Sequence, residues 1–422
     1  MRVVYPICCG VDVHKTFLVA TIVTTTKEGA PIYQKKRFST FNKSLRELRE
    51  WLLANNCHDV CMESTGKYYI PLYNLLEDDF HVTVANPKWV AAIKGNKDDV
   101  KDSKWIADLF RVGYVPNSFI PSRPIRILRE YTRYRYKLVC CKSAEKNRYQ
   151  NAFTVCNIAL DAVVSDMFGK SATAILDYIV NAESFDLKHC VSLLHRSMIK
   201  KADQVVEAIE GFQMTADQKQ RIRFVKSHLG YIDSLLREMD SKIDSMVTPI
   251  DNAISLLRSI PGVDRSTAIT VLSEIGTNMD QFSSSHRLCA WAGLAPSNNQ
   301  SAGKKKSVRI LRAGVYLKPA LVQAAHAAVK DKDSPYYRTK YERIAKRRGK
   351  KRAIIAIARM ILTAVYHMLK TGESWNPCDL ARIDMPQELH ERQQNQAIKQ
   401  AANFLIKHGI VLPEHVRLPA VA

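Results

Sequence analysis

The chain has 422 residues, with 63 Lys and Arg against 41 Asp and Glu, and so a formal net charge of +22. This length allows two or three domains, and the charge favours a polyanionic partner such as nucleic acid, with an anionic membrane surface as the competing interpretation. The N-terminus lacks the pattern of a signal peptide, and Arg359 and His367 interrupt the longest apolar segment, 353–369, which favours a packed helix over a membrane span. We expect a cytoplasmic protein without a membrane partner.

Ten cysteines occur without any C-x-x-C pair. Cys57 and Cys61 flank a predicted strand, but no second pair stands at the spacing of a structural zinc site. We therefore expect reduced thiols, most of them buried, rather than zinc ligands.

Strands and helices alternate in the first predicted domain, residues 1–118. Segments rich in β-branched and aromatic residues predict strands, and apolar residues at three- and four-residue steps predict helices. In chain order these are strands over 7–15, 17–26 and 32–39, a helix capped by Asn42 and continuing through Leu52, a strand over 60–63, a helix over 69–76 and a strand over 81–85. This is the order of an RNase H-like fold, in which the first three strands are antiparallel and Asp12 and Glu63 lie on central, neighbouring strands.

Acidic residues stand at three points of this domain. Asp12 lies near the end of an apolar strand, where a carboxylate is costly unless a cation or a donor meets it. Glu63 ends the fourth strand, and Asp99 and Asp102 lie one turn apart on the predicted buried side of the next helix. Four converging carboxylates stay ionised around hard divalent cations such as Mg²⁺, so the pattern predicts a metal-dependent enzyme that acts on phosphodiesters.

Two neighbouring residues leave alternatives open. Asp98 stands four residues before Asp102 and is either a ligand in place of Asp99 or the N-cap of the helix. His14 follows Asp12 by two residues and so lies on the same face of the strand, as a hydrogen-bonding partner of the acid site or as a packed histidine.

Long helices are predicted over residues 119–250. Residues 123–148 carry nine Lys and Arg against two acids, interleaved with Tyr131, Tyr134 and Tyr136, which suits a nucleic-acid backbone or a solvated helix with tyrosines in its seam. Apolar residues recur at three- and four-residue steps over 222–243. Such a coiled-coil-like stripe is typical of an oligomer interface or an intramolecular hairpin.

A third domain is predicted over residues 251–375, followed by a tail of helical tendency, 376–422. A helix, a tight turn at Gly262 and a second helix form a helix-hairpin-helix-like element, whose second N-terminus can hold a phosphate. Residues 301–352 carry 17 Lys and Arg against three acids, a net charge of +14. This concentration beside a Gly-containing loop favours DNA or RNA over a solvated face.

Three tyrosines in this region are interpreted as packing or DNA-backbone contacts rather than as nucleophiles. They are Tyr336, Tyr337 and Tyr341. The arginine and histidine set expected around the nucleophile of a tyrosine recombinase cannot be assembled from this sequence.

Six motifs, in order along the chain up to about residue 370, resemble those of one known family. They are 10–15 (GVDVHK), 62–66 (MESTG), 97–102 (KDDVKD) with 105–107 (WIA), then 260–263 (IPGV), 291–296 (WAGLAP) and 298–304 (NNQSAGK). Together they are similar to the Asp-Glu-Asp-Asp motifs and the second conserved domain of the transposases of IS110-type insertion sequences. Each motif is short, but the ordered set is specific.

The resemblance implies an RNA-guided DNA recombinase with a RuvC-like RNase H-fold domain, a coiled-coil middle and a C-terminal transposase domain that carries a nucleophilic serine. By motif, the acids that hold Mg²⁺ are Asp12, Glu63, Asp99 and Asp102, and the nucleophile is Ser301. The implied partners are target and donor DNA, a structured guide RNA made from the element itself (a bridge RNA), and further copies of the chain as a dimer of dimers. The implied location is a prokaryotic cytoplasm, in association with the nucleoid.

Positive side chains after Ser301 and at the end of the basic segment are the predicted nucleic-acid contacts. They are Lys304, Lys305, Lys306, Arg309, Arg312, Arg347 and Arg348. Two alternatives remain open: a RuvC-like nuclease that cleaves DNA with metal-activated water and uses Ser301 structurally, and a scaffold that binds nucleic acid with a degenerate acid site.

Overall fold

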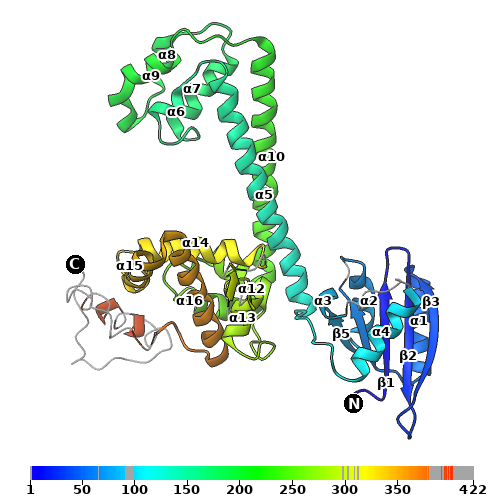
Figure 1. The fold of residues 1–422 in the computed structure, drawn as a ribbon. Helices are drawn as coiled ribbons and strands as arrows, with labels where there is room; N and C mark the ends of the chain where they lie inside the picture. Colours follow the sequence, from blue (N-terminus) through cyan, green and yellow to red (C-terminus); the bar gives the residue numbers. More distant parts are fainter. Residues whose placement is uncertain are drawn as a thin grey trace. The chain divides into compact units, whose positions relative to one another are not determined.

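The computed structural model divides into two compact units, Met1–Ile120 and Pro121–Ala422 (Figure 1). It describes residues 2–64, 66–90, 99–296, 299–301, 304–307, 309–310, 313–377, 379, 391, 394–396, 398 and 400–402. Within these ranges, only the backbone is described for residues 88, 89, 99–101, 299–301 and 304–307. The predicted domain borders near residues 118, 250 and 375 stay predictions, and most of the predicted tail lies outside the described residues.

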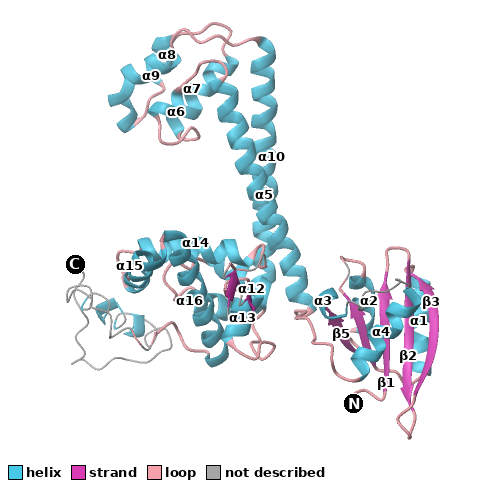
Figure 2. Cartoon of the chain, in the orientation of Figure 1, coloured by secondary structure: helices cyan, strands magenta, loops and turns pink. Residues whose placement is uncertain are grey.

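A five-stranded mixed sheet forms the centre of the first unit (Figure 2). Its strands lie in the order β3-β2-β1-β4-β5; β1 and β2 pair antiparallel, as do β2 and β3, whereas β4 runs parallel to both β1 and β5. The strands are β1 (Ile7–Val13), β2 (Phe17–Thr25), β3 (Pro31–Ser39), β4 (Asp59–Glu63) and β5 (His81–Ala85). The expected succession of strands and the antiparallel pairing of the first three are confirmed.

Helices cover the sheet on two faces, because side chains alternate along each strand. One face, which includes Val11 and Leu18, packs against α1 (Asn42–Ala54) and α2 (Tyr69–Leu76). The other face packs against α4 (Asp99–Arg111), which follows the short helix α3 (Pro87–Val90). The expected cap of α1 is wrong by one residue: Phe41 is the N-cap, and no side chain caps the helix.

A long antiparallel helical hairpin dominates the first part of the second unit. It consists of α5 (Arg123–Thr154) and α10 (Ala216–Val247), each 32 residues long. Leu138 of α5 packs against Ile232, Leu236 and Met239 of α10 in the seam. The apolar stripe of α10 therefore packs within the chain, which supports the hairpin among the two alternatives.

A small helical cluster packs where α5 ends and α10 begins (Figure 1). Its buried residues come from the ends of α5 and α10 and from the helices between them. These are α6 (Leu160–Val163), α7 (Lys170–Asn181), α8 (Leu187–Ser192), the 3₁₀ helix η1 (Arg196–Lys201) and α9 (Ala202–Ile209).

The described remainder of the second unit is helical apart from a two-stranded hairpin. Its elements are η2 (Thr248–Ile250), α11 (Asp251–Leu257), α12 (Arg265–Ile275), α13 (Ser285–Trp291), β6 (Asn299–Ser301), β7 (Lys304–Ser307), α14 (Leu317–Lys330), α15 (Tyr336–Arg348) and α16 (Lys350–Thr371). The turn between α11 and α12 needs glycine, because Gly262 has φ of +82° and a Cβ there would lie 2.4 Å from the Ala324 carbonyl oxygen of α14.

Helix α16 is the one described helix that is long and apolar enough to cross a membrane by length and composition, and half of its apolar window is buried within the protein. It packs against α13, α14 and α15. Ile357, Ile361 and Val365 lie in this buried surface. These contacts are those of a core helix, as expected for the segment 353–369.

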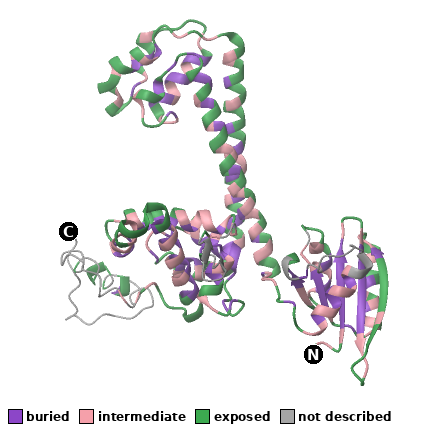
Figure 3. Ribbon diagram, in the orientation of Figure 1, coloured by how far each residue is buried: buried purple, intermediate pink, exposed green. Residues whose placement is uncertain are grey.

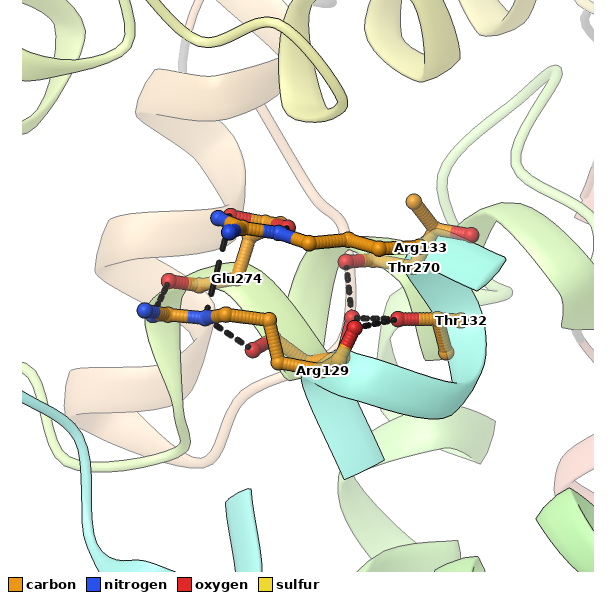
Figure 4. A network of polar contacts seen from close by, with 6 residues as sticks. Arg129, Thr132, Arg133, Thr270 and Glu274 are labelled. Atoms are coloured by element: carbon orange, nitrogen blue, oxygen red, sulfur yellow. Dashed lines mark hydrogen bonds and ion pairs between the residues drawn. The ribbon is translucent and has the colours of Figure 1, made fainter. Parts of the chain in front are cut away.

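An ion pair with a buried carboxylate joins α5 to α12 (Figure 4). The Arg133 guanidinium donates two hydrogen bonds, of 2.7 and 2.8 Å, to Glu274, whose side chain is only 5% exposed. Arg129 donates to the carbonyl oxygens of Ser273 and Glu274, and the Thr132 and Ser273 hydroxyls lie 2.9 Å apart. The network thus satisfies the polar groups where the long hairpin meets the C-terminal helices.

Glu274→Gln is expected to destabilise the second unit by about 2 kcal/mol or more. The change removes the negative charge that pairs with Arg133 and Arg129, and the cost stays below the ~3–5 kcal/mol of a fully buried pair because Arg133 is 40% exposed. Chemical denaturation of the full chain measures the effect. The control is Asp251→Asn, which removes an exposed pair with Arg265 and should cost less than ~1 kcal/mol; equal effects would contradict the structural role of Glu274.

The cysteines with described side chains are free thiols. Those at 8, 9, 57, 61, 156, 190 and 289 are buried, whereas Cys141 is half-buried and Cys140 is exposed; Cys378 lies outside the described residues. Burial raises the pKa of Cys57 and of Cys61 to about 12, so these thiols stay protonated near neutral pH. Mostly buried, reduced thiols are what the sequence predicted.

Candidate active site

Asp12 and Glu63 lie on central strands and on the same face of the sheet. β1 and β4 run parallel, with Gly10 opposite Cys61, so two residues further along this register Asp12 stands opposite Glu63. Because side chains alternate along a strand, Asp12 lies on the same face as Cys8, and Glu63 lies on the same face as Cys61. Both cysteines pack on the α4 side of the sheet. The structure therefore brings these two acids, 51 positions apart in sequence, to one place beside α4.

Helix α4 crosses this face in direct contact with β1. A Cβ on Gly10 would lie 2.3 Å from the backbone nitrogen of Ala107 and 2.4 Å from the carbonyl oxygen of Ser103, so only glycine admits the helix at this distance. The hydroxyls of Thr21 and Ser103 share a buried hydrogen bond of 2.8 Å. Because Asp102 immediately precedes Ser103, these contacts also fix the position of the Asp102 backbone.

The buried stripe of α4 differs slightly from the predicted one. Its buried residues are Ser103, Ile106, Ala107 and Phe110. Asp102 is half-buried and lies at the border of this stripe. The small side chains of Ser103 and Ala107 allow the helix to pack close to the sheet. The face of α4 that contacts the sheet therefore includes these two residues, and Asp102 stays accessible at the edge of that face.

The choice between Asp98 and Asp99 stays open. Asp99 begins α4, one turn before Ser103, and only its backbone is described. Asp98 lies outside the described residues.

Asp12 is almost completely buried and is held by a histidine. It is 7% exposed, and its Oδ2 lies 3.0 Å from His14 Nε2, which donates when the ring carries its proton there. The His14 ring stacks on Phe17, with 4.5 Å between the ring centroids. Of the two alternatives for His14, the hydrogen-bonding partner is therefore confirmed, and the histidine packs as well.

The donor atoms fit a hard divalent cation. Carboxylate oxygens from Asp12, Glu63 and Asp102 are the ligands that Mg²⁺ prefers, and a buried carboxylate such as Asp12 is stabilised by a cation nearby. Among the side chains that are described, no three His, Cys, Asp or Glu residues form a complete metal-binding group. The fourth predicted ligand, Asp99, is not among those side chains.

Ser301 lies at the end of β6, where its backbone pairs with Lys304 of β7. The predicted nucleophile therefore stands in the same short hairpin as Lys304, Lys305 and Lys306. For these four residues only the backbone is described, and Arg312 lies outside the described residues. Arg309, which follows the hairpin, is exposed.

Arg347 and Arg348 lie at the exposed end of α15. Every Lys and Arg between residues 346 and 352 is exposed, across the turn from α15 into α16 (Figure 3). This turn is made by Gly349, which has φ of +83°. The turn thus presents a concentrated positive surface, as expected for a nucleic-acid contact.

The basic segment of α5 serves internal contacts. Arg133 pairs with Glu274, Arg135 pairs with Asp240 of α10, and Lys142 pairs with Asp233. Among its tyrosines, Tyr131 packs in the seam with α10 and Tyr136 packs edge-on against Tyr316, whereas Tyr134 is exposed. This arrangement supports the helix with tyrosines in its seam over the nucleic-acid track.

The N-terminus of α12 already holds a carboxylate. Asp264 accepts a hydrogen bond of 2.7 Å from the backbone nitrogen of Thr267, and Arg265 pairs with Asp244 and Asp251. A phosphate at this helix end would meet these acids. The predicted phosphate contact at the helix-hairpin-helix-like element is therefore disfavoured in this structure.

Two of the three tyrosines of α15 are packing residues, and the third, Tyr341, is half-buried. Tyr336 and Tyr337 are 5% and 1% exposed. Tyr336 donates to Asp379, and the Tyr337 hydroxyl accepts from Trp375. Their burial supports the interpretation that they are not nucleophiles.

Comparison with known proteins finds two family models in the chain. Residues 9–158 match the model DEDD_Tnp_IS110, described as a transposase, and residues 254–342 match the model described as the transposase IS116/IS110/IS902 family. Together the matches cover more than half of the chain. The chain belongs to the IS110 transposase family. The first match contains the four predicted acids, and the second contains Ser301.

A curated relative of this family is the transposase for insertion sequence element IS1111A of Coxiella burnetii, which is 31% identical over 126 residues. The match covers 28% of this chain and 33% of that protein. The similarity thus spans a third of the relative's length.

The family motifs predicted the acids but not the contacts that position them. Thr21 and Ser103 were not singled out, although a serine on an otherwise apolar helix stripe is a signal for a buried hydrogen bond. Gly10 was recognised only as part of a motif, and its neighbours on α4 are almost a hundred positions away in sequence.

Proposed function

We propose that this protein is the transposase of an IS110-type insertion sequence and that it cleaves, exchanges and rejoins DNA strands. The observation that carries the proposal is the meeting of Asp12, Glu63 and helix α4 on one face of a mixed sheet. This site lies within the segment that matches the DEDD model. The strand order β3-β2-β1-β4-β5 supports a RuvC-like RNase H fold for the first unit.

Asp12, Glu63, Asp99 and Asp102 would hold Mg²⁺ in this proposal. When bound, the cation supplies Lewis-acid polarisation of the scissile phosphate and neutralises charge in the transition state. The chain contributes orientation: His14 holds the Asp12 carboxylate through Oδ2, and the buried contacts of α4 fix the backbone that carries Asp102.

Ser301 is the proposed nucleophile. Its Oγ attacks the phosphorus, a Ser–O–P bond forms, the P–O bond to one strand end breaks, and the released oxygen takes up a proton. A serine hydroxyl needs such activation at neutral pH, to which Lys304, Lys305, Lys306 and Arg309 contribute by neutralising the phosphate. Because the ester conserves the phosphodiester energy, attack by a new strand end rejoins the DNA without a nucleotide.

The proposal extends to guidance by a structured RNA made from the element and to assembly as a dimer of dimers. The concentrated charge of residues 301–352 and the exposed cations between residues 346 and 352 support nucleic-acid partners, with Arg312, Arg347 and Arg348 as contacts. The acids and Ser301 belong to different compact units, which is compatible with acids of one copy acting with the serine of another.

Ser301→Ala is expected to abolish a covalent protein–DNA adduct while RNA binding stays unchanged. The substitution removes the attacking oxygen and no charge. Denaturing gel electrophoresis of labelled DNA that carries the element's ends measures the adduct. The control is Ser307→Ala at the other end of the same hairpin, which should keep adduct formation; an adduct that survives in Ser301→Ala would exclude this residue as nucleophile.

One observation favours a second candidate, a metal-dependent nuclease that uses activated water. The predicted acids belong to β1, β4 and α4, all within the first unit, whereas Ser301 belongs to the second. Cleaved strands with free 5′-phosphate ends and no trapped protein, from both the original protein and Ser301→Ala, would establish this candidate.

A further inference from the structure

The edge strand β3 carries an exposed run of positive charge. Lys35, Lys36 and Arg37 are all exposed, and the strand is exposed along most of its length (Figure 3). No carboxylate partner of these three side chains lies among the described residues. Lysines on an edge strand hinder its pairing with other chains and so resist aggregation. That role explains why β3 is charged, but it does not require the charges to lie on one particular face of the sheet.

The strand register separates these three cations onto two faces. Tyr33 donates to Asp108 of α4, whereas Phe38 packs in the core with α1. Because β3 pairs with β2 without interruption from Pro31 to Ser39, side chains alternate regularly between these limits. Lys35 and Arg37 therefore share the α4 face with Tyr33, and Lys36 lies on the opposite face with Phe38.

Arg37 lies in the same row across the sheet as the acid site. It pairs with Val19 of β2, and Val19 pairs with Asp12 of β1. Two strand spacings separate Arg37 from Asp12, on the order of 10 Å. Lys35 lies one row further along, opposite Thr21, which in turn pairs with Gly10.

A chain of contacts links the Arg37 guanidinium to the Asp12 carboxylate. The guanidinium lies over the Phe17 ring, 3.9 Å from the ring centre, Phe17 stacks on His14, and His14 bonds to Asp12. The cation–π contact restrains the Arg37 side chain, so that less side-chain entropy is lost when an anion binds.

We propose that Arg37 and Lys35 form a phosphate-binding rim that holds the backbone of the DNA strand entering the acid site. The inference rests on the proposed function, since the acids mark where the scissile phosphate lies. A distance of about 10 Å exceeds the axial rise of one nucleotide, ~3.4 Å, so the rim contacts phosphates that flank the one at the acids. DNA is the occupant because the row leads directly to the site of DNA cleavage.

The test measures how the affinity of the full-length chain for duplex DNA depends on salt. A labelled duplex of about 20 base pairs is titrated in EDTA at salt concentrations of about 50 to 200 mM. Each lost phosphate contact reduces the slope of log K against log salt by about 0.9. Arg37→Gln and Lys35→Gln should each show this reduction, and the double substitution about twice as much.

Lys36→Gln is the matched control, since it removes the same charge from the same strand on the opposite face. Its slope should equal that of the original protein, and equal slopes for Arg37→Gln and Lys36→Gln would overturn the proposal. A reduction seen with an RNA duplex but not with DNA would assign the rim to RNA and overturn the choice of DNA. Because binding in EDTA is independent of cleavage, loss of the rim effect and loss of the proposed catalytic function are distinguishable results.

Discussion

Asp12→Asn is expected to lower the rate of metal-dependent DNA cleavage by at least about 1,000-fold. The change removes the negative charge of Asp12, which is 7% exposed, and loss of a metal ligand costs several kcal/mol of transition-state stabilisation. Cleavage of DNA that carries the element's ends, with Mg²⁺ in excess, measures the rate. EDTA should reduce the original protein to the same residual rate.

The matched control for this substitution is Asp59→Asn. Asp59 lies on the same face of β4 as Glu63, at the opposite end of the strand. Its carboxylate lies 3.4 Å from His81. Its replacement removes the same charge from the same face and should change the rate less than about twofold. If Asp12→Asn left cleavage intact, the acid site would not be the catalytic centre. If the original protein cleaved no DNA in Mg²⁺ either, the protein would be a nucleic-acid-binding scaffold.

Gly10→Ala is expected to displace α4 and to destabilise the first unit by about 3 kcal/mol or more. The added methyl group would lie 2.3 and 2.4 Å from backbone atoms of α4, and backbone cannot turn aside as a flexible side chain can. Because α4 carries Asp102 and Asp99, the same change should also abolish cleavage. Hydrogen exchange of residues 99–111 in the full chain, together with denaturation, measures the displacement.

Gly230→Ala is the control, and it should change the free energy of unfolding in the opposite direction. Gly230 lies within α10 with nothing within 4 Å of an added Cβ, so alanine should stabilise the helix by about 0.5–1 kcal/mol. Unchanged exchange of α4 in Gly10→Ala would contradict the close contact between Gly10 and the backbone of α4.

The sequence by itself determined the local elements of the first unit and predicted which acids form the candidate site. Segments rich in β-branched and aromatic residues predicted the strands, because a buried strand needs such residues whatever it pairs with. The ordered motifs predicted Asp12, Glu63 and Ser301 as members of a known set. These signals are local, so a single chain reveals them without any contact being known.

Pairing between distant segments was decided only by the tertiary structure. The basic residues of α5 suited both a nucleic-acid track and a packed helix, and the choice depended on Glu274, Asp240 and Asp233, all about a hundred or more positions away. The face on which Arg37 lies likewise follows from the β3 register and from the contact of Tyr33 with α4. Charge and spacing predict that a side chain needs a partner, but the fold selects which one it meets, because burial and register depend on segments that are remote in sequence.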